Sequence, residues 1–395
     1  MSHDVRVVGV GMVPFSTPSR SESYHVMGAR AASRALADAG IGYESIQQVY
    51  AGHVYGDSTS GQRAMYEVGM IGIPIINVNN NCSTGSTALY LARQAVESGA
   101  AECVLALGFE QMQRGKLVQH WTDRPTPFDR FDAVTDALQG IDPEAPMAAQ
   151  YFGGAAREYA QRFGIAPETF AQVAVKARSH AAHNPYAVFR DPVTVEEVMA
   201  SPRVLGDLTR LQCCPPTCGA AAAVIVSADF ARTRGLRADV AIRAQAMATD
   251  TPAVFEEPSM IKIVGYDLTV DASRQVYEDS GVAPEDIRVL ELHDCFTPME
   301  VLTYEALGLT PEGTAEKFIR GGQNTYGGQV VVNPSGGLLS KGHPLGATGL
   351  AQCAELVWQL RGQAGARQVE NATLALQHNV GLGGAAVVTL YENAT

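Results

Sequence analysis

The stretch DAGIGYESI at residues 38–46 decides the fold, because a second version of it, DSGVAPEDI, stands at residues 279–287. Each version follows an amphipathic helix pattern, over residues 27–39 and 271–280, and each leads into a strand-like segment. Glycine, which both versions carry at the same place, is the residue type that commonly ends a helix. The chain therefore contains two units of the same helix–glycine–strand kind.

A second pair of matching stretches follows the first. GSTAL at residues 85–89 and GATGL at residues 346–350 each begin a predicted helix, and each helix leads into a strand. The two matches come in the same order in both halves of the chain, which favours an internal duplication. General similarity among α/β proteins is the alternative explanation. Duplication predicts two half-domains of alternating strands and helices that pack against each other.

The segment between the copies has a different texture, because it is rich in proline and its predicted helices stand apart from one another. Thr194 and Glu197 form a capping-box pattern at the start of its last helix. We therefore expect a helical insertion over the first half, suited to act as a lid or to grip a ligand. The predicted units are an N-terminal half (1–112 and 215–235), the insertion (113–214) and a C-terminal half (236–395).

Composition and charge narrow the class of protein. The 395 residues are 46% hydrophobic and 18% charged, which is ordinary for a globular enzyme and excludes a disordered chain. A formal net charge of −12 disfavours a nucleic-acid partner. No apolar run approaches the roughly 20 residues that span a bilayer. Because no signal peptide is visible and arginine far outnumbers lysine, we expect a cytoplasmic, bacterial protein.

The seven cysteines are irregularly spaced, so a disulfide framework is not expected. Cys213, Cys214 and Cys218 form the one cluster, which lacks the second half of a zinc site, and no metal is expected. Cys82 is the candidate nucleophile, because it lies between a predicted strand and the helix that begins near Gly85. The positive end of that helix is expected to lower the pKa of the thiol. A buried structural cysteine is the alternative.

The duplication strengthens the nucleophile hypothesis. Cys82 lies three residues before Gly85, and His343 lies three residues before Gly346. A thiol and an imidazole are therefore expected at equivalent helix N-termini that face a shared central region. A Cys–His pair is a common means of activating a thiol, although a histidine taken alone is more often structural.

Two further predicted loops carry polar groups. His293 and Cys295 follow the strand of the second glycine unit, and ligands bind at the carboxyl ends of such strands. His378 begins a glycine-rich loop that contains Gly381 and Gly383. Its N–H groups could form an anion or oxyanion hole, or the loop could be only a tight turn.

Together these motifs resemble those of the thiolase superfamily: NNNCSTG around Cys82, HDCF at 293–296, GHP around His343 and HNVG at 378–381. More closely, the chain is similar over nearly its whole length to the SCP2-thiolase type, which includes the thiolase domain of sterol carrier protein x and bacterial lipid-transfer or acetyl-CoA acetyltransferase-like proteins. The resemblance implies the five-layered thiolase fold of two βαβαβαββ halves with an inserted helical loop domain. It suggests a thiolase unit without the appended sterol carrier domain.

The resemblance also implies roles for the site residues. Cys82 would attack the 3-oxo carbon and hold the acyl group as a thioester, and His343 would activate it. Cys295 would be the acid and base at the substrate α-carbon, while His293 would replace the asparagine that orders an oxyanion-hole water. The implied oxyanion hole consists of Cys82, His343, Gly381 and Gly383.

The implied function is a 3-oxoacyl-CoA thiolase, an acetyl-CoA C-acyltransferase of fatty-acid or sterol side-chain degradation by β-oxidation. CoA and acyl-CoA are expected as substrates, with no tightly bound cofactor, and the protein is expected to be at least a homodimer. A separate lipid carrier or other partner protein is compatible with this function. The candidate contacts for CoA are Arg178, Arg190 and His378.

Two other functions stay open. One is an acyltransferase or aldolase-like carbon–carbon bond enzyme on the same scaffold, acting on non-CoA or partner-delivered substrates. The other is a non-catalytic acyl-CoA-binding subunit. Retention of the full set of Cys and His residues disfavours the second.

Overall fold

The computed structural model describes residues 4–115 and 121–394, and within them the chain forms two equivalent sets of strands. The first set is β1 (Val5–Met12), β2 (Gln48–Gly52), β3 (Ile75–Val78), β4 (Cys103–Glu110) and β7 (Gly219–Ser227). The second is β8 (Val240–Ala248), β9 (Val289–Glu291), β10 (Val331–Val332), β11 (Leu374–Gly381) and β12 (Ala385–Asn393).

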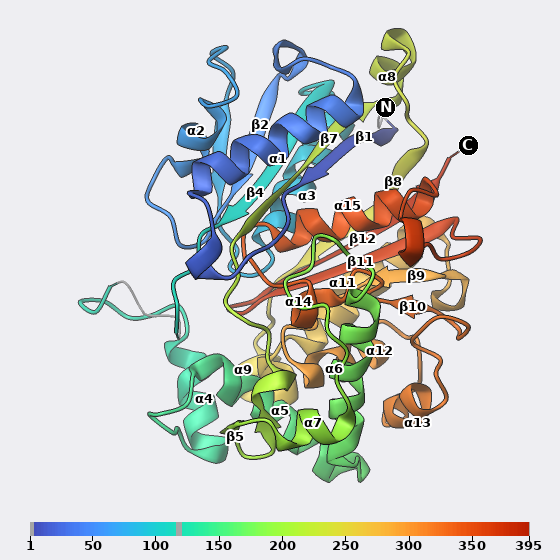
Figure 1. Ribbon diagram of the computed structural model, residues 1–395. Coiled ribbons are helices and arrows are strands. Elements are labelled where there is room, and N and C mark those ends of the chain that lie inside the picture. Colours follow the sequence, from blue (N-terminus) through green and yellow to red (C-terminus); the bar gives the residue numbers. More distant parts are fainter. Residues whose placement is uncertain (1–3, 116–120, 395) are drawn as a thin grey trace.

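The strand order of the large sheet confirms the duplication. It runs β10-β9-β11-β12-β8-β1-β7-β4-β2-β3, so the second set repeats the order of the first in reverse. Within the described part of the chain, the two sets of strands pair with each other at two positions between β1 and β8, Arg6 with Ala241 and Val7 with Val240. In each set four strands run in the same direction, and one strand, β7 or β12, runs antiparallel to both of its neighbours. The molecule is therefore two five-stranded half-domains related by an approximate two-fold axis (Figure 1).

The two glycine units fold alike. Gly40 ends α1 (Tyr24–Ala39) and Gly281 ends α11 (Tyr266–Ser280), with left-handed φ angles of 70° and 67°. Only glycine adopts this conformation without strain. In both units a single 3₁₀ turn then connects the helix to the following strand. Both predicted helices are present, and each begins a few residues earlier than the periodicity indicated.

The helices make five layers with the two five-stranded halves of the large sheet. α1 packs on the outer face of β1 and β7, and α11 packs on the outer face of β8 and β12. Between these two halves of the sheet, α3 (Thr84–Glu97) contacts α15 (Thr348–Leu360), and these are the two helices predicted from the second repeat. Remaining helices of the halves are α2 (Ser60–Met65), α8 (Ala228–Arg234), α9 (Ala253–Glu256), α10 (Met260–Ile263), α12 (Thr297–Ala306), α13 (Ala315–Arg320) and α14 (Gly337–Ser340).

The crossing of α3 and α15 depends on glycine. A Cβ atom at Gly85 would lie 2.8 Å from the Gly346 carbonyl oxygen, and one at Gly349 would lie 2.3 Å from the Ser86 nitrogen. Real side chains do not approach backbone that closely, so the two repeat glycine motifs allow the helix starts to meet. This contact brings the loops that precede α3 and α15, which carry Cys82 and His343, to the centre of the molecule.

The insertion is helical as expected, but it does not lie over the first half. Its elements are α4 (Asp129–Gln139), α5 (Met147–Phe163), α6 (Pro167–Ala181), α7 (Val195–Ala200), β5 (Arg203–Leu205) and β6 (Leu208–Thr209). α5 and α6 pack against α10, α12 and α14 of the second half (Figure 1). Phe152 stacks on Phe296 with ring centroids 4.7 Å apart, and the Tyr159 hydroxyl donates a hydrogen bond to the Glu305 carboxylate. The expected placement was wrong because these apolar side chains find their partners in the second half.

The predicted capping box at the start of α7 is present. The Thr194 side chain accepts a hydrogen bond from the Glu197 N–H, and the Glu197 side chain accepts one from the Thr194 N–H.

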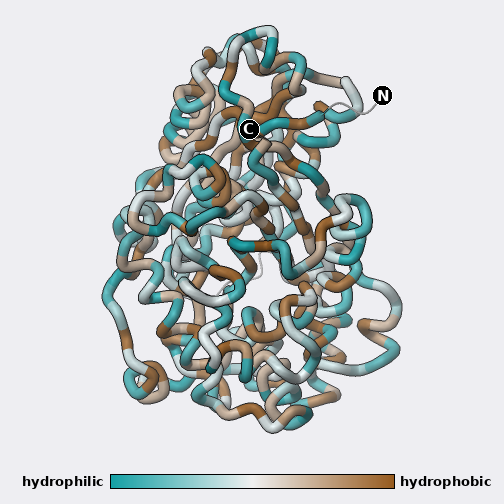
Figure 2. The backbone as a smooth tube through the Cα atoms, turned by 90° about the vertical axis from the view of Figure 1, so that its right-hand side faces the viewer, coloured by the Kyte–Doolittle hydropathy of each residue, from teal (hydrophilic) through white to brown (hydrophobic). Residues whose placement is uncertain are grey.

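Hydrophilic segments dominate the outer loops, and hydrophobic ones run through the interior (Figure 2). No helix among the described residues is long and apolar enough to cross a bilayer.

Candidate active site

Cys82 lies in a tight loop between β3 and α3. The Asn80 N–H donates to Thr84 Oγ1 at 2.8 Å, and Asn81 adopts a left-handed φ of 51°. The Asn81 side-chain amide reaches across to the Leu382 carbonyl, 3.1 Å away in the β11–β12 loop. The polar residues before Cys82 therefore fix the turn and also join it to the opposite half.

His343 presents one free nitrogen to the same region. Its Nδ1 lies 2.7 Å from Thr348 Oγ1, and the Thr348 hydroxyl donates to the Pro344 carbonyl at 3.1 Å. With the single hydrogen of that hydroxyl on the Pro344 carbonyl, Nδ1 is the donor to Thr348 and carries the imidazole proton. Nε2 then holds a lone pair, and it is buried with no hydrogen-bond partner in the part of the chain that the structure describes. A ring nitrogen with a free lone pair can accept a proton from a neighbouring group.

The structure brings Cys82, His293 and His343 together. The Cys82 sulfur and one ring nitrogen from each histidine all lie within 4.8 Å of one another, and this is the one group of potential metal ligands among the described residues. The two imidazole rings are nearly perpendicular, with centroids 5.1 Å apart. Cys295 is buried beside them, and its thiol interacts electrostatically with those of Cys82 and Cys214.

The expectation of a lowered Cys82 pKa was wrong. Although Cys82 keeps partial exposure, desolvation of its sulfur raises the pKa of the thiol to about 12, and the Glu110 carboxylate adds to the rise. The N–H groups of Cys82 and Leu382 act in the opposite direction but do not outweigh burial. α3 begins only at Thr84 with Ser83 as its N-cap, so the positive end of the helix is not centred on the sulfur.

The histidines are also neutral. Desolvation lowers the pKa of His343 to about 3 and that of His293 well below its usual value, with His343 and His378 contributing to the latter. Burial raises the pKa of Cys295 well above its usual value, so this thiol keeps its proton. The site therefore holds neutral thiols and neutral imidazoles rather than a thiolate–imidazolium pair.

Glu110 is a site residue that the sequence reasoning missed. It ends β4, and its carboxylate accepts the N–H groups of Val54, Tyr55 and Gly346 at 3.0–3.1 Å. Burial raises the pKa of Glu110 to about 7. An acidic residue at the carboxyl end of an otherwise apolar strand was the available signal. Glu110 connects the first half to the start of the Gly346 segment.

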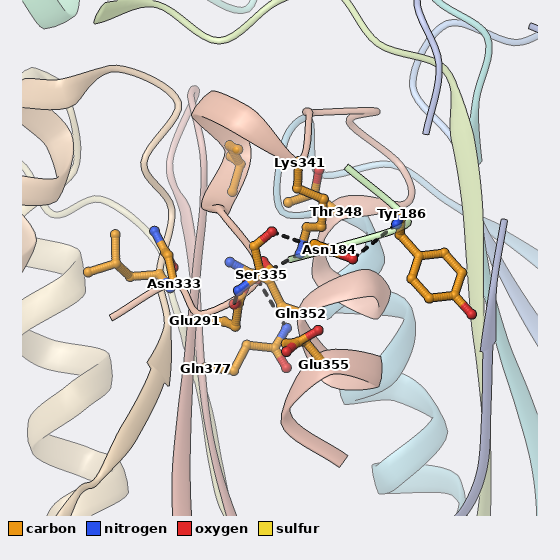
Figure 3. Close-up of polar contacts among 12 residues, drawn as sticks. Asn184, Tyr186, Glu291, Asn333, Ser335, Lys341, Thr348, Gln352, Glu355 and Gln377 are labelled. Carbon is orange, nitrogen blue, oxygen red and sulfur yellow. Dashed lines mark hydrogen bonds and ion pairs between the residues drawn. The ribbon is translucent and has the colours of Figure 1, made fainter. Parts of the chain in front are cut away.

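A buried ion pair lies under the two histidine loops. Lys341 Nζ lies 3.2 Å from Glu291 Oε2, and both side chains are at most 1% exposed. Ser335 donates its hydroxyl and its N–H to the same carboxylate (Figure 3). Glu291 precedes His293 by two residues, and Lys341 precedes His343 by two residues. The pair therefore fixes the spacing of the two loops.

Replacing Lys341 with methionine is expected to lower the free energy of unfolding by about 3–5 kcal/mol, because it leaves a buried carboxylate without its cation. Chemical denaturation monitored by circular dichroism would measure this loss. The double variant Lys341→Met/Glu291→Gln should recover part of it. A single variant as stable as the native protein would contradict the structural role of the ion pair.

In the glycine-rich loop, the N–H group near Cys82 does not come from the predicted residues Gly381 and Gly383. The loop amide that contacts the Cys82 sulfur is that of Leu382, between the two predicted glycines. Gly381 lies against the Cys82 loop, where a Cβ atom would come within 2.2 Å of the Asn80 carbonyl oxygen. Gly383 has a φ of 92° and faces Phe128 of the insertion. Gly381 thus permits the close approach of the Cys82 loop, and its neighbour Leu382 provides the N–H donor to the Cys82 sulfur.

The three residues predicted to contact CoA lie in different surroundings. Arg178 stacks over the Phe189 ring at 4.7 Å, and Arg190 is exposed. His378 does not suit the predicted contact, because it is completely buried and its Nε2 lies 3.0 Å from Thr269 Oγ1 on α11. Adjacent residues of a strand point to opposite faces, and it is Asn379 that faces the candidate site, with Nδ2 2.8 Å from His293 Nδ1.

The cysteine cluster separates in the fold. Cys218 is buried in the core of the first half, and Cys213 packs against the core of the second. Cys214 lies nearer the candidate site, since its N–H donates to the Cys295 carbonyl at 2.9 Å and its thiol interacts with that of Cys82. The sequence reasoning considered Cys214 only as a metal ligand and missed this position.

Comparison with known proteins agrees with the fold. The model of the thiolase N-terminal domain matches residues 5–229, and that of the thiolase C-terminal domain matches residues 246–392. These matches span most of the chain. The chain therefore belongs to the thiolase family.

Two curated relatives and one solved structure narrow the likeness. Sterol carrier protein 2 of Oryctolagus cuniculus is 54% identical over 392 residues, which cover 98% of this chain and 72% of that protein. Benzoylsuccinyl-CoA thiolase subunit BbsB of Thauera aromatica is 36% identical, covering 100% and 99%. The Ltp2-ChsH2(DUF35) aldolase structure has a TM-score of 0.84 at 26% identity and covers 99% and 98%.

Proposed function

We propose that this protein is a 3-oxoacyl-CoA thiolase that cleaves its substrate with CoA through an acyl-Cys82 intermediate. One observation carries the proposal: a ring nitrogen of His343 lies within 4.8 Å of the Cys82 sulfur and of a His293 nitrogen, and Nε2 is the His343 nitrogen that has no hydrogen-bond partner among the described residues. A neutral thiol beside a free basic nitrogen is suited to nucleophilic attack with concerted proton removal.

The first half-reaction follows from these positions. His343 Nε2 takes the thiol proton as the Cys82 sulfur attacks the 3-oxo carbon. The bond between C2 and C3 breaks, and its electron pair passes to the enolate of acetyl-CoA. The Cys295 thiol gives its proton to C2, which releases acetyl-CoA and leaves the shortened acyl group on Cys82.

The second half-reaction restores the enzyme. The thiol of an incoming CoA gives its proton to the Cys295 thiolate and attacks the acyl thioester. As the Cys82 sulfur leaves, His343 returns the first proton to it. The N–H groups of Cys82 and Leu382 and the imidazole of His293 are the donors available for the two oxyanions.

The direct test supplies a 3-oxoacyl-CoA with and without CoA and identifies products by mass spectrometry. Formation of acetyl-CoA and a shortened acyl-CoA that depends on CoA is the expected result. A CoA-independent release of an aldehyde or ketone would instead support an aldolase-like reaction.

An aldolase-like reaction is the second candidate function, because the chain is similar to a structure titled as an aldolase with a DUF35 protein. Cys82 favours the thiolase, since an aldolase needs no acyl acceptor.

The neutral thiol leads to a prediction on pH dependence. Because the Cys82 pKa is raised to about 12, its thiolate fraction grows about tenfold per pH unit across pH 6–10. Alkylation of Cys82 by iodoacetamide, quantified by peptide mapping in the absence of CoA, should rise over this whole range. A plateau that begins below pH 8 would indicate a preformed thiolate instead.

We also propose a homodimer that forms through the edge of the first half. β3 is the edge strand of the sheet, and apolar side chains beside it are 37–74% exposed: Tyr66, Met70, Ile71 and Ile76. An exposed edge strand with apolar neighbours is prone to pair with another chain. Light scattering should give twice the chain mass of 41.9 kDa, and Ile76→Lys should shift it to the monomer. A native mass near 41.9 kDa would contradict the dimer.

A further inference from the structure

A continuous series of buried side chains ends at His293. It starts on β12, crosses β11 and α3, returns to β11 and reaches the loop after β9. Its members, in order, are Tyr391, Gln377, Ser86, Asn379 and His293. All five are at most 2% exposed. These residues bring polar groups from both half-domains to one imidazole nitrogen.

The first amide of the series has only one possible orientation. Gln377 Nε2 lies 2.7 Å from the Gly349 carbonyl oxygen, which can only accept. Gln377 Oε1 accepts the Tyr391 hydroxyl at 2.5 Å. Gln352 supports this arrangement, because its Nε2 donates to the His378 carbonyl and its Oε1 faces Gln377 Nε2 (Figure 3). Gln377 therefore directs N–H toward Ser86.

The orientation passes from Ser86 to His293. Ser86 Oγ accepts from Gln377 at 2.9 Å, so its own hydrogen goes to Asn379 Oδ1, also at 2.9 Å. This places Asn379 Nδ2 toward His293 Nδ1 at 2.8 Å. The reverse orientation of Asn379 would aim two N–H donors at the Ser86 oxygen and leave the hydroxyl hydrogen without an acceptor among the described residues. His293 Nδ1 is therefore an acceptor.

We propose that Asn379, held by this series, fixes His293 with its proton on Nε2, so that His293 donates a hydrogen bond into the candidate site and does not serve there as a metal ligand. Asn379 acts as a positioning residue. The donor role rests on the proposed thiolase function, since an oxyanion is what the proton would meet. The rejection of metal does not depend on that function.

The donor atoms of the three side chains do not suit a zinc ion. A thiol and two imidazoles within 4.8 Å resemble the three protein ligands of many zinc sites. Zinc needs an imidazole lone pair, and His343 Nε2 has one, but His293 Nε2 carries a hydrogen. To free that nitrogen, the proton would have to move to Nδ1 and face the Asn379 N–H group. The amide therefore leaves zinc with two ligands where three side chains converge.

The proton position can be measured in the native protein. Nitrogen-15 NMR of protein labelled at histidine distinguishes the two neutral forms of an imidazole, and the His293 signals are identified by their loss in His293→Asn. The expected spectrum shows His293 protonated at Nε2 and His343 protonated at Nδ1. His293 protonated at Nδ1 would overturn the proposal.

Exchanging one atom should reverse the arrangement. In Asn379→Asp the carboxylate accepts from His293 Nδ1–H and frees Nε2, which recreates the carboxylate–histidine–metal arrangement of zinc sites. The affinity for Zn²⁺, titrated against a chromophoric chelator, should rise at least about 10–100-fold. Adding Cys82→Ser should remove the gain. Equal Zn²⁺ affinity in the native protein and Asn379→Asp would overturn the proposal.

The matched control is Gln245→Glu, an amide-to-acid change at another buried position, where the amide donates to Thr389 at 2.8 Å and not to a histidine. It should change neither the His293 spectrum nor Zn²⁺ binding. If Asn379→Asp does not fold, Ser86→Ala replaces it, because loss of the hydroxyl lets Asn379 rotate and should produce both His293 forms. Neither readout requires turnover, so an inactive native protein with the expected spectrum would refute the thiolase function alone.

Discussion

Cys82→Ala is expected to abolish thiolysis, with a loss in kcat on the order of 10⁶, the size seen when a catalytic nucleophile is removed. The acyl group then has no acceptor, and neither the His343 base nor the oxyanion donors can replace one. Steady-state assays with a 3-oxoacyl-CoA and CoA, run at high enzyme concentration, would measure the loss.

Cys214→Ala is the matched control for this variant. Its thiol interacts with that of Cys82, and burial raises its pKa well above the usual value. The proposed reaction does not use it. The control should therefore keep most of the native rate. Equal losses in both variants would mean that the thiols act through packing, and a fully active Cys82→Ala would refute the acyl-enzyme route.

Cys295→Ala is expected to lower the rate of thiolysis by about 10²–10⁴-fold, which is the usual contribution of a general acid–base group. Exchange of the substrate α-proton should fall by a similar factor. The variant should still accept an acetyl group on Cys82 from acetyl-CoA, because that step does not involve the α-carbon. Stopped-flow thiolysis, deuterium exchange and intact mass would report the three quantities separately.

His343→Ala is the informative contrast, because it removes the base that acylation needs. It should impair adduct formation itself. If Cys295→Ala blocked acetylation of Cys82 while α-proton exchange stayed at the native rate, the roles of the two thiols would have to be reassigned.

The two glycine units predicted more of the architecture than any other feature. Gly40 and Gly281 mark the same step in each half, and the strand order of the sheet repeats accordingly. Equivalence of the halves also predicted that Cys82 and His343 approach each other, which the 4.8 Å group confirms. Local sequence was enough to predict these features, because in both units a glycine in the left-handed conformation ends the helix.

Features that depend on tertiary surroundings were not predictable. Helix periodicity shows that α5 has an apolar face but not that Phe152 stacks on Phe296 in the other half. The position of Cys82 before a helix suggested a lowered pKa, whereas desolvation, which local sequence does not reveal, raises it to about 12.

Asn379 and His378 illustrate a choice between neighbours. Both belong to the HNVG motif, and an imidazole is the more familiar functional group. Strand alternation was a usable signal that only one of them could face the site, but the facing side depends on the partners. Those partners, Ser86 and His293, lie 293 and 86 residues away in the chain.

The most direct test of the thiolase mechanism is to expose the protein briefly to acetyl-CoA and locate the acyl group by intact mass and peptide mapping. We expect one acetyl group per chain on the peptide that contains Cys82, removed again by added CoA and absent from Cys82→Ala. Acetylation confined to another cysteine, with Cys82 unmodified and thiolysis intact, would contradict the proposed function.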